Sequence, residues 1–199
     1  MRYHDSMQFV IGVDEVGRGP LAGPIAIGVV AMPIELNDWR LWEGLKDSKK
    51  LTEKKREEWF LRVKADSRLE WHVSSSGARI IDTKGIVGAA KDASVRAIGK
   101  ISYTPDEAHV VLDHGLSVSE EWIQEQFIKG DENIPVIALA SIMAKVTRDR
   151  YMVQLAEEHP LYGFESHKGY GSKRHQEAIL LHGPIAGIHR KLFIRNLLK

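Results

Sequence analysis

Residues 11–20 read IGVDEVGRGP, an apolar run that ends in two adjacent carboxylates and then a glycine-rich turn. The apolar half predicts a buried strand. Asp14 and Glu15 at its end need a cation or a hydrogen-bond donor, because burying a charged group without a partner costs free energy. The turn allows backbone N–H groups to come close to a phosphate or a sugar. A site for metal and phosphate is therefore the first hypothesis, and a hairpin whose acids face water is the alternative.

The composition is that of an ordinary globular protein. The chain has 199 residues, of which 43% are hydrophobic and 28% charged, so it can form one sizeable domain with its own core. It contains no cysteine, which excludes disulfides, thiolate metal sites and a cysteine nucleophile. No apolar run approaches the ~20 residues that cross a bilayer, and no signal-peptide core precedes Asp14. We expect a cytoplasmic protein.

The net charge of +1 hides an asymmetry along the chain. Residues 166–199 contain seven basic residues and a single acid, Glu177, whereas the remainder is net acidic. A basic C-terminal segment on an acidic body favours a nucleic-acid partner. A solvated helix with a basic face accounts for the charge equally well.

The hydrophobic pattern predicts strands early in the chain and helices later. Residues 9–13 and 24–32 are expected to pair as a hairpin across a turn at 17–23, because that turn is short. A mixed sheet flanked by helices, with two helical crossovers, follows from this order and places the chain in the α/β class. The other predicted strands are 69–75 and 109–113, and the predicted helices are 53–65, 86–101, 135–158, 173–181 and 189–198.

A second strand also ends in an acid. Val110, Val111 and Leu112 precede Asp113 just as an apolar run precedes Asp14. The ends of strands in such a sheet converge on one edge, where ligand sites of α/β proteins usually lie. We therefore expect Asp113 beside Asp14.

The helix expected at 135–158 is apolar nearly all round at residues 137–146, so it should be buried. Ser141, Lys145 and Asp149 recur at intervals of four residues and share one face. A polar stripe on a buried helix needs partners, and this favours a place for Asp149 in the site. A surface ion pair between Lys145 and Asp149 is the alternative.

The candidate carboxylates Asp14, Glu15, Asp113 and Asp149 are hard oxygen ligands, which suit Mg²⁺ or Mn²⁺. Two such ions can stabilise both the attacking and the leaving oxygen of a phosphodiester displacement. Neighbouring residues of a regular strand point to opposite faces. Asp14 and Glu15 can therefore serve one site only if the strand ends or bends near Gly17.

The glycine-rich loop at residues 163–171 adds a basic residue and an aromatic ring. Lys168 could contact phosphate, and Tyr170 could stack on a sugar or base. An ordinary loop with an exposed tyrosine is the alternative interpretation.

With these motifs in view, the chain resembles the type 2 ribonuclease H family, the bacterial ribonuclease HII enzymes. The similarity extends over about residues 8–195 in consistent order, and its motifs lie at residues 13–24, 47–51, 129–131, 140–150, 167–171, 182–184 and 189–190. It implies a ribonuclease H-like fold, a mixed central sheet ringed by helices, with a helical C-terminal region at 160–199 that grips the hybrid duplex. It also implies one catalytic domain over residues 1–199, and we expect a monomer.

The resemblance further implies an endonuclease that cleaves the RNA strand of RNA–DNA hybrids. It would cut 5′ to ribonucleotides embedded in duplex DNA, with two Mg²⁺ or Mn²⁺ ions, and leave 3′-OH and 5′-phosphate ends. Asp14, Glu15, Asp113 and Asp149 would hold the metal. Gly17, Arg18 and Gly19 would read the 2′-OH, the group that distinguishes RNA from DNA. Tyr170 would stack near the next deoxyribose, and the remaining expected substrate-binding residues are Lys49, Ser141, Lys145, Lys168 and Arg190.

The chain departs from the family pattern at one position. Asp113 is followed by His114 and Gly115, where the family usually has glycine directly after the acid. The side chain of His114 would either alter the turn that aims Asp113 or join the site. No added N-terminal domain precedes the core, which argues against the related type 3 enzymes.

Three other functions remain open from the sequence. A different carboxylate-metal nuclease would cut all-DNA substrates. A hybrid-binding protein without activity would require the loss of an acid, and all four are present. A glycosidase-like use of Asp14 and Glu15 as acid and base would work without metal.

Overall fold

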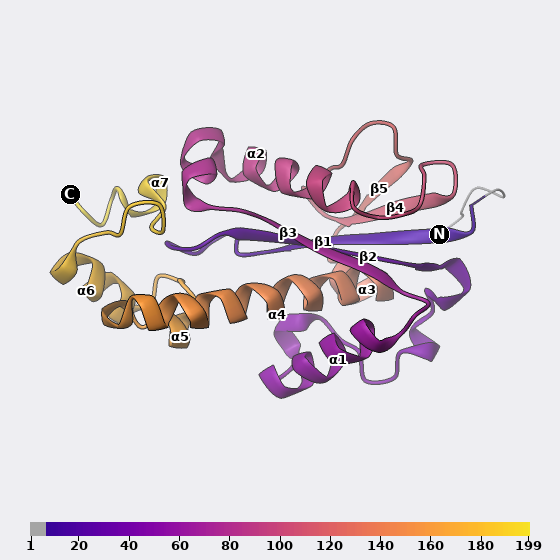
Figure 1. Cartoon of the computed structure of the whole chain (residues 1–199), viewed down its shortest axis with the longest axis horizontal. Coiled ribbons are helices and arrows are strands. Elements are labelled where there is room, and N and C mark those ends of the chain that lie inside the picture. The colour runs from indigo at the N-terminus through magenta and orange to yellow at the C-terminus, as the bar shows by residue number, and fades with distance from the viewer. Residues whose placement is uncertain (1–6) are drawn as a thin grey trace.

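One five-stranded mixed sheet organises the computed structural model, which describes residues 7–199 (Figure 1). The strand order is β3-β2-β1-β4-β5, in which β1 pairs with β2 antiparallel and with β4 parallel. Val13 of β1 lies opposite Leu112 of β4, so the next residues, Asp14 and Asp113, lie side by side where the pairing of these two strands ends. The strands are β1 (Phe9–Val16), β2 (Ile25–Pro33), β3 (Glu70–Ser76), β4 (Ala108–Asp113) and β5 (Gln124–Phe127).

Helices cover both faces of the sheet. Figure 1 shows α2 (Ala78–Ile98) on one face and α4 (Pro135–Glu158) on the other, with α1 (Glu53–Ala65) beyond α4. The C-terminal helices gather at the end of the molecule where α4 ends. The remaining helices are α3 (Gly130–Asn133), α5 (Phe164–His167), α6 (Lys173–His182) and α7 (Lys191–Ile194), and the 3₁₀ turns are Ile34–Leu36, Trp39–Leu41, Ser48–Lys50 and Pro160–Tyr162.

The core has one apolar cluster on each face of the sheet. Val10, Val30 and Met32 pack against Ile137 and its neighbours in α4. Residues of the opposite strand faces, such as Ile11 and Ile27, pack against α2. Because side chains alternate along a strand, β1 and β2 supply both clusters. A third cluster, around Ala22, Met152 and Phe164, holds the C-terminal helices on the end of α4.

Two glycines allow α4 to lie directly on the sheet. A Cβ at Gly12 would collide with the Val136 carbonyl group, and a Cβ at Gly28 would collide with the Ala140 carbonyl oxygen. Gly28 is the β2 partner of Asp14. The close approach of α4 therefore brings Ser141, the residue after Ala140, to the acid at the end of β1.

Most of the predicted elements are present. The helices at 53–65 and 135–158 have the predicted bounds, and the sheet is mixed as expected. Helix α2 is divided at Gly85, whose φ is 72°, so the part after this kink begins at 86 as predicted, whereas the part that begins at Ala78 was not predicted. Strand β5 was not predicted, since its sequence QEQF shows no apolar alternation. The last helix covers only Lys191–Ile194 of the predicted range 189–198.

Within the described part of the chain, no helix combines the length and the apolar character of a membrane-spanning segment.

Candidate active site

Three carboxylates meet at the edge of the sheet where β1 and β4 end. One oxygen from each of Asp14, Glu15 and Asp113 lies within 4.8 Å of the other two. Asp14 is buried, and the other two side chains are half-buried. Strand β1 continues to Val16, yet the two adjacent acids share the site. The Asp14 carboxylate turns along the strand and accepts a hydrogen bond from the Glu15 N–H at 2.7 Å.

The electrostatics of this acid group disfavour three negative charges. Burial raises the pKa of Asp14 well above its ordinary value, and the charges of Glu15 and Asp113 raise it further against hydrogen bonds from Ser141 and the Glu15 N–H. Burial also raises the pKa of Glu15, against the opposing effect of Arg18. Arg18 Nε donates to Glu15 Oε1 at 2.9 Å. Its positive charge compensates only part of the acid group.

One carboxylate oxygen of the group is left without a partner. Glu15 Oε2 is buried and makes no hydrogen bond within residues 7–199. A buried oxygen of this kind is costly unless a cation or donor reaches it. The three ligand atoms of the group are carboxylate oxygens, the donors that Mg²⁺ and Mn²⁺ prefer. The residues present therefore fit a divalent cation held by Asp14, Glu15 and Asp113.

A fourth acid, Asp131 of α3, lies close enough to Asp113 for their charges to interact. Its side chain is buried, and its pKa is raised by burial and by the charges of Asp47 and Asp113, against the opposing effect of Lys49. Lys49 Nζ lies 3.6 Å from Asp131 Oδ2. The preceding residue, Gly130, donates its N–H to Asp113 Oδ1 at 2.8 Å. The motif at 129–131 was part of the family resemblance, and it is the signal that could have identified Asp131.

Asp149 does not belong to the acid group, which corrects the expectation from its place on α4. Lys145 Nζ lies 2.9 Å from Asp149 Oδ1. Asp149 also lines a pocket together with Glu53 and Arg56, which belong to α1. It shares a helix face with Ser141, but eight residues of helix separate the two by about 12 Å. Ser141 is the residue that reaches Asp14. Burial lowers the pKa of Lys145, and Asp149 opposes that effect.

Two expected substrate residues, Ser141 and Lys49, lie beside the carboxylates. Ser141 Oγ is 2.8 Å from Ser48 Oγ in a buried contact, and Ser141 also bonds toward Asp14. Lys49 faces Asp131, and its pKa is raised by Asp131 and Asp14 against the effect of burial. The Lys49 side chain is largely exposed, so it can meet a ligand that approaches the acids.

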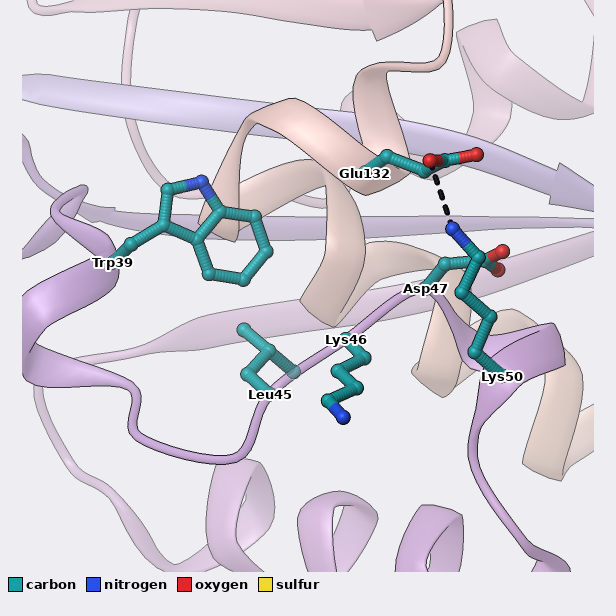
Figure 2. A pocket seen from close by; sticks show the side chains of 6 residues that line it. All are labelled: Trp39, Leu45, Lys46, Asp47, Lys50 and Glu132. Carbon is teal, nitrogen blue, oxygen red and sulfur yellow. Dashed lines mark hydrogen bonds and ion pairs between the residues drawn. The ribbon is translucent and has the colours of Figure 1, made fainter.

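A cavity of about 400 Å³ lies next to this region (Figure 2). It is lined by Trp39, Leu45, Lys46, Asp47, Lys50 and Glu132. The dashed line in Figure 2 marks the ion pair between Lys50 and Glu132, at 2.8 Å. Lys50 and Glu132 directly follow Lys49 and Asp131 in the chain, so the cavity borders the acid group without including Asp14, Glu15 or Asp113.

The loop after β1 is held from inside by a buried arginine. Arg190 is fully buried and donates to the carbonyl oxygens of Gly17 at 2.6 Å, Arg18 at 3.0 Å and Gly23 at 3.0 Å. We expected Arg190 to contact substrate directly, but its guanidinium is buried and faces the inside of the loop. Gly19 has open space around its Cα, since a Cβ added there would meet nothing within 4 Å. The outer face of the loop remains accessible.

A second buried arginine joins this loop to the glycine-rich loop at 167–171. Arg148 donates to the carbonyls of Pro24 at 2.9 Å, Ala22 at 3.3 Å and Lys168 at 3.0 Å. The Leu21 N–H donates to the Gly169 carbonyl at 2.9 Å. The Arg148 guanidinium lies 5.8 Å from the Tyr170 ring centroid, and Tyr170 is 43% exposed. Tyr170 therefore lies beside the Gly17–Gly23 loop with its ring accessible.

His114 stands outside the acid group, on an exposed turn after β4. The left-handed position of that turn is taken by Gly115, whose φ is 83°. The Cβ of His114 therefore does not disturb the direction of Asp113.

Known proteins share this architecture and sequence. The family model described as Ribonuclease HII matches residues 11–196. Ribonuclease HII of Caldicellulosiruptor bescii is 42% identical over 196 residues, 98% of this chain and 91% of that protein. Ribonuclease HII of Bacillus subtilis is 44% identical over 186 residues, 94% of this chain and 69% of that protein. The crystal structure of ribonuclease H2 from Pyrococcus horikoshii aligns with a TM-score of 0.68 and 27% identity, over 95% of this chain and 96% of that one.

Proposed function

This chain belongs to the ribonuclease HII family, and from that premise we propose that it cuts 5′ to ribonucleotides embedded in duplex DNA as well as within longer hybrids. Membership makes it a metal-dependent endoribonuclease of the ribonuclease H class with the ribonuclease H-like fold. The single observation that carries the finer proposal is the contact between the acid group and the Gly17–Gly23 loop. Arg18 belongs to that loop and bonds Glu15.

We propose that Asp14, Glu15 and Asp113 hold the divalent metal, with Asp131 as the fourth carboxylate in place of Asp149. Three observations support this assignment. The oxygens of Asp14, Glu15 and Asp113 lie within 4.8 Å of one another, one buried Glu15 oxygen has no hydrogen-bond partner within residues 7–199, and the pKa of Asp131 is raised. Bound Mg²⁺ or Mn²⁺, two ions per site in this proposal, would activate water and stabilise the leaving 3′ oxygen. Ser141 keeps Asp14 oriented by a hydrogen bond, and Arg18 does the same for Glu15.

The Gly17–Gly19 segment is proposed to read the sugar. Arg190 and Arg148 hold carbonyls of this loop on its inner side, so its remaining polar groups are available on the outer side to the 2′-OH, which both donates and accepts hydrogen bonds. Tyr170 would stack on the deoxyribose that follows. Lys49 and Lys168 would contact phosphates, and the resulting products would carry 3′-OH and 5′-phosphate ends.

The basic C-terminal region at 160–199 is proposed to grip the duplex. Lys191 and Arg195 are exposed near the end of the chain, and exposed cations at this end suit phosphate contacts that carry no sequence information. The protein would act as a monomer in the cytoplasm.

Cleavage-site mapping tests the proposed function. A duplex with one ribonucleotide, an all-DNA duplex and a long hybrid are incubated with the enzyme, with Mg²⁺, Mn²⁺ or EDTA. The expected result is a single cut 5′ to the ribonucleotide with metal, and no cut in all-DNA or in EDTA. Cleavage of the all-DNA duplex, or activity in EDTA, would contradict the proposal.

A further inference from the structure

Three histidine rings lie together beneath the Tyr170 loop, away from the carboxylates. His175 and His189 are almost fully buried, at 0% and 2% exposure. Their Nε2 atoms are 3.2 Å apart, and the His167 ring stacks on His175 with a centroid distance of 4.4 Å. Histidines packed this closely must be neutral unless a counter-charge is present. Their hydrogen bonds are therefore decided by which ring nitrogen carries the proton.

The partners of His175 and His189 fix both tautomers. His175 Nδ1 faces the Tyr170 carbonyl oxygen at 2.8 Å, which can only accept, so Nδ1 carries the proton and Nε2 presents a lone pair. His189 Nδ1 faces the Ile185 N–H at 2.8 Å, which can only donate. Nδ1 of His189 is therefore the acceptor, and its Nε2 carries the proton. The His189 Nε2–H consequently donates to His175 Nε2.

The result is a relay of hydrogen bonds that all point the same way, from the Ile185 N–H through His189 and His175 to the Tyr170 carbonyl. His167 follows the same rule, because its Nδ1 accepts from the Gly169 N–H at 3.2 Å and its Nε2 donates to the Tyr162 carbonyl at 2.8 Å. Every nitrogen of the three rings is satisfied when all three are neutral. No other distribution of three protons satisfies them.

Each end of the relay is attached to a substrate-facing loop. On the His175 side it holds the backbone of Tyr170. On the His189 side, His189 pairs with Ala22 in a β-bridge, and the next residue, Arg190, holds the carbonyls of Gly17 and Arg18. The Gly23 N–H also donates to Ile188 at 2.9 Å. The bond between the two rings is thus a further connection between the Tyr170 loop and the loop that starts at Gly17, in addition to Arg148 and the Leu21–Gly169 backbone hydrogen bond.

We propose that His175 and His189 are positioning residues, whose mutual hydrogen bond acts together with Arg148 to fix Tyr170 relative to the Gly17–Gly19 segment so that a ribonucleotide is distinguished from a deoxyribonucleotide. This rests on the proposed function, because it assigns the two loops to the substrate. The rings do not touch the substrate themselves. They set the spacing between the loop that reads the 2′-OH and the ring that stacks on the next sugar.

The relay has a defined pH range. A second proton on either ring would place two N–H donors against each other, and the pair would separate. Burial lowers the pKa of both His175 and His189 to about 4. The titratable groups that act on them are other histidines, His167 on His175, and His175 and His159 on His189, and a positive charge on any of these would lower the pKa further. Since the pKa of both rings in the folded protein is about 4, the relay is intact at neutral pH and is lost as pH falls through about 4.

The tautomers are tested by NMR of the full chain with ¹⁵N-labelled histidine at pH 7. The expected spectrum shows His175 protonated at Nδ1, and His189 and His167 protonated at Nε2. A spectrum with His175 protonated at Nε2, or with either ring of the pair charged at pH 7, would overturn the proposal. This measurement needs no substrate, so it stands apart from the proposed function.

The positioning role is tested by binding, in an Asp14→Asn background that prevents cleavage. The Kd is measured for a duplex with one ribonucleotide and for the all-DNA duplex, and their ratio is the readout. His175→Asn keeps a donor near the Tyr170 carbonyl but loses the bond to His189. The loss of this one bond is expected to reduce the ratio about tenfold, whereas the exposed matched control His182→Gln leaves it unchanged.

The acid dependence gives the second arm of the binding test. In the background protein the ratio should hold between pH 7 and pH 5 and fall only as pH is lowered through about 4, and in His175→Asn it should be low and flat over the same range. A purely structural role would weaken both duplexes together and leave the ratio unchanged, which would overturn the proposal. If the background protein itself does not prefer the ribonucleotide duplex, the proposed reading of the 2′-OH fails, and the tautomer spectrum decides the relay by itself.

Discussion

Asp14 shows how a single residue can be costly to the fold and central to the proposed site. It is 3% exposed, and its carboxylate lies against two other acids. Burial and the charges of Glu15 and Asp113 together raise its pKa well above the ordinary value of 3.8. When ionised, a side chain held in this way destabilises the metal-free protein, and a bound cation would offset that cost.

The first prediction concerns Asp14→Asn. The change should abolish cleavage, because it removes a proposed metal-binding charge, while hybrid binding remains. Turnover and Kd are measured on the same hybrid duplex. Normal turnover would remove Asp14 from the mechanism.

The same variant should raise the Tm of the metal-free protein at pH 7.5. Because the folded pKa of Asp14 is raised, the folded state binds the proton more tightly than the unfolded chain, and ionising Asp14 lowers stability as pH rises above 3.8. The gain in Tm from asparagine should therefore shrink as pH is lowered toward 4. Calorimetry in EDTA at several pH values measures it. A gain that does not depend on pH would contradict the raised pKa.

Asp131 and Asp149 provide a matched comparison at the residue scale. Asp131→Asn should reduce cleavage by at least about tenfold, since Asp131 faces Asp113 and Lys49. Asp149→Asn should leave the rate within about threefold, since its partner is Lys145 on the same helix. Single-turnover rates at saturating metal compare the two. If Asp149→Asn reduced the cleavage rate more than Asp131→Asn, Asp149 would belong to the site and Asp131 would not.

At the scale of elements, the contact between α4 and the β1–β2 hairpin sets the position of Ser141. The contact is close because Gly12 and Gly28 have no side chain to separate the helix from the sheet. A helix so apolar along its first half is buried whatever its neighbours. Only the two glycines determine how near its backbone comes to the strands.

Gly28→Ala should therefore lower the free energy of unfolding by about 1–3 kcal/mol, because the added methyl group collides with the Ala140 carbonyl. It should also reduce cleavage, as Ser141 moves away from Asp14. Urea unfolding measures the first effect and hybrid cleavage the second. Gly77→Ala is the control, because nothing lies within 4 Å of its Cβ and its φ is −74°. Equal effects of the two variants would contradict the role of close packing.

At the scale of the whole molecule, charge is separated between the site and the C-terminal end. The acids gather at the end of β1 and β4, and the exposed cations Lys191 and Arg195 lie near the C-terminus. Such a separation suits a polyanion that is held by one part of the protein and cut at another.

Replacing both Lys191 and Arg195 by alanine should weaken hybrid binding and reduce the slope of log K against log salt by up to about 1.8, since each phosphate contact contributes about 0.9. The control replaces the exposed lysines Lys54 and Lys91 of α1 and α2, which removes the same charge elsewhere. Titrations over a range of salt give both slopes. An unchanged slope in the C-terminal variant would mean that another surface grips the duplex.

The sequence by itself determined the elements with strong patterns and the motifs on them. Helices 53–65 and 135–158 have a regular pattern with a capping Thr52 and an N-terminal Pro135, so their bounds were predictable. The meeting of Asp14 with Asp113 was also predictable, because parallel strands that end in acids deliver them to one edge. Local pattern and topology are sufficient for both.

Only the tertiary structure decided which of the other charged residues reach the site. Asp149 shares a helix face with Ser141, but distance along the helix separates it from the acids, whereas α3 brings Asp131 to them. Arg190, which was expected to bind substrate, is buried beneath the loop after β1. The relay of His175 and His189 joins segments that no local pattern relates. Burial and pairing depend on packing between segments far apart in the chain, and periodicity within one segment contains no information about them.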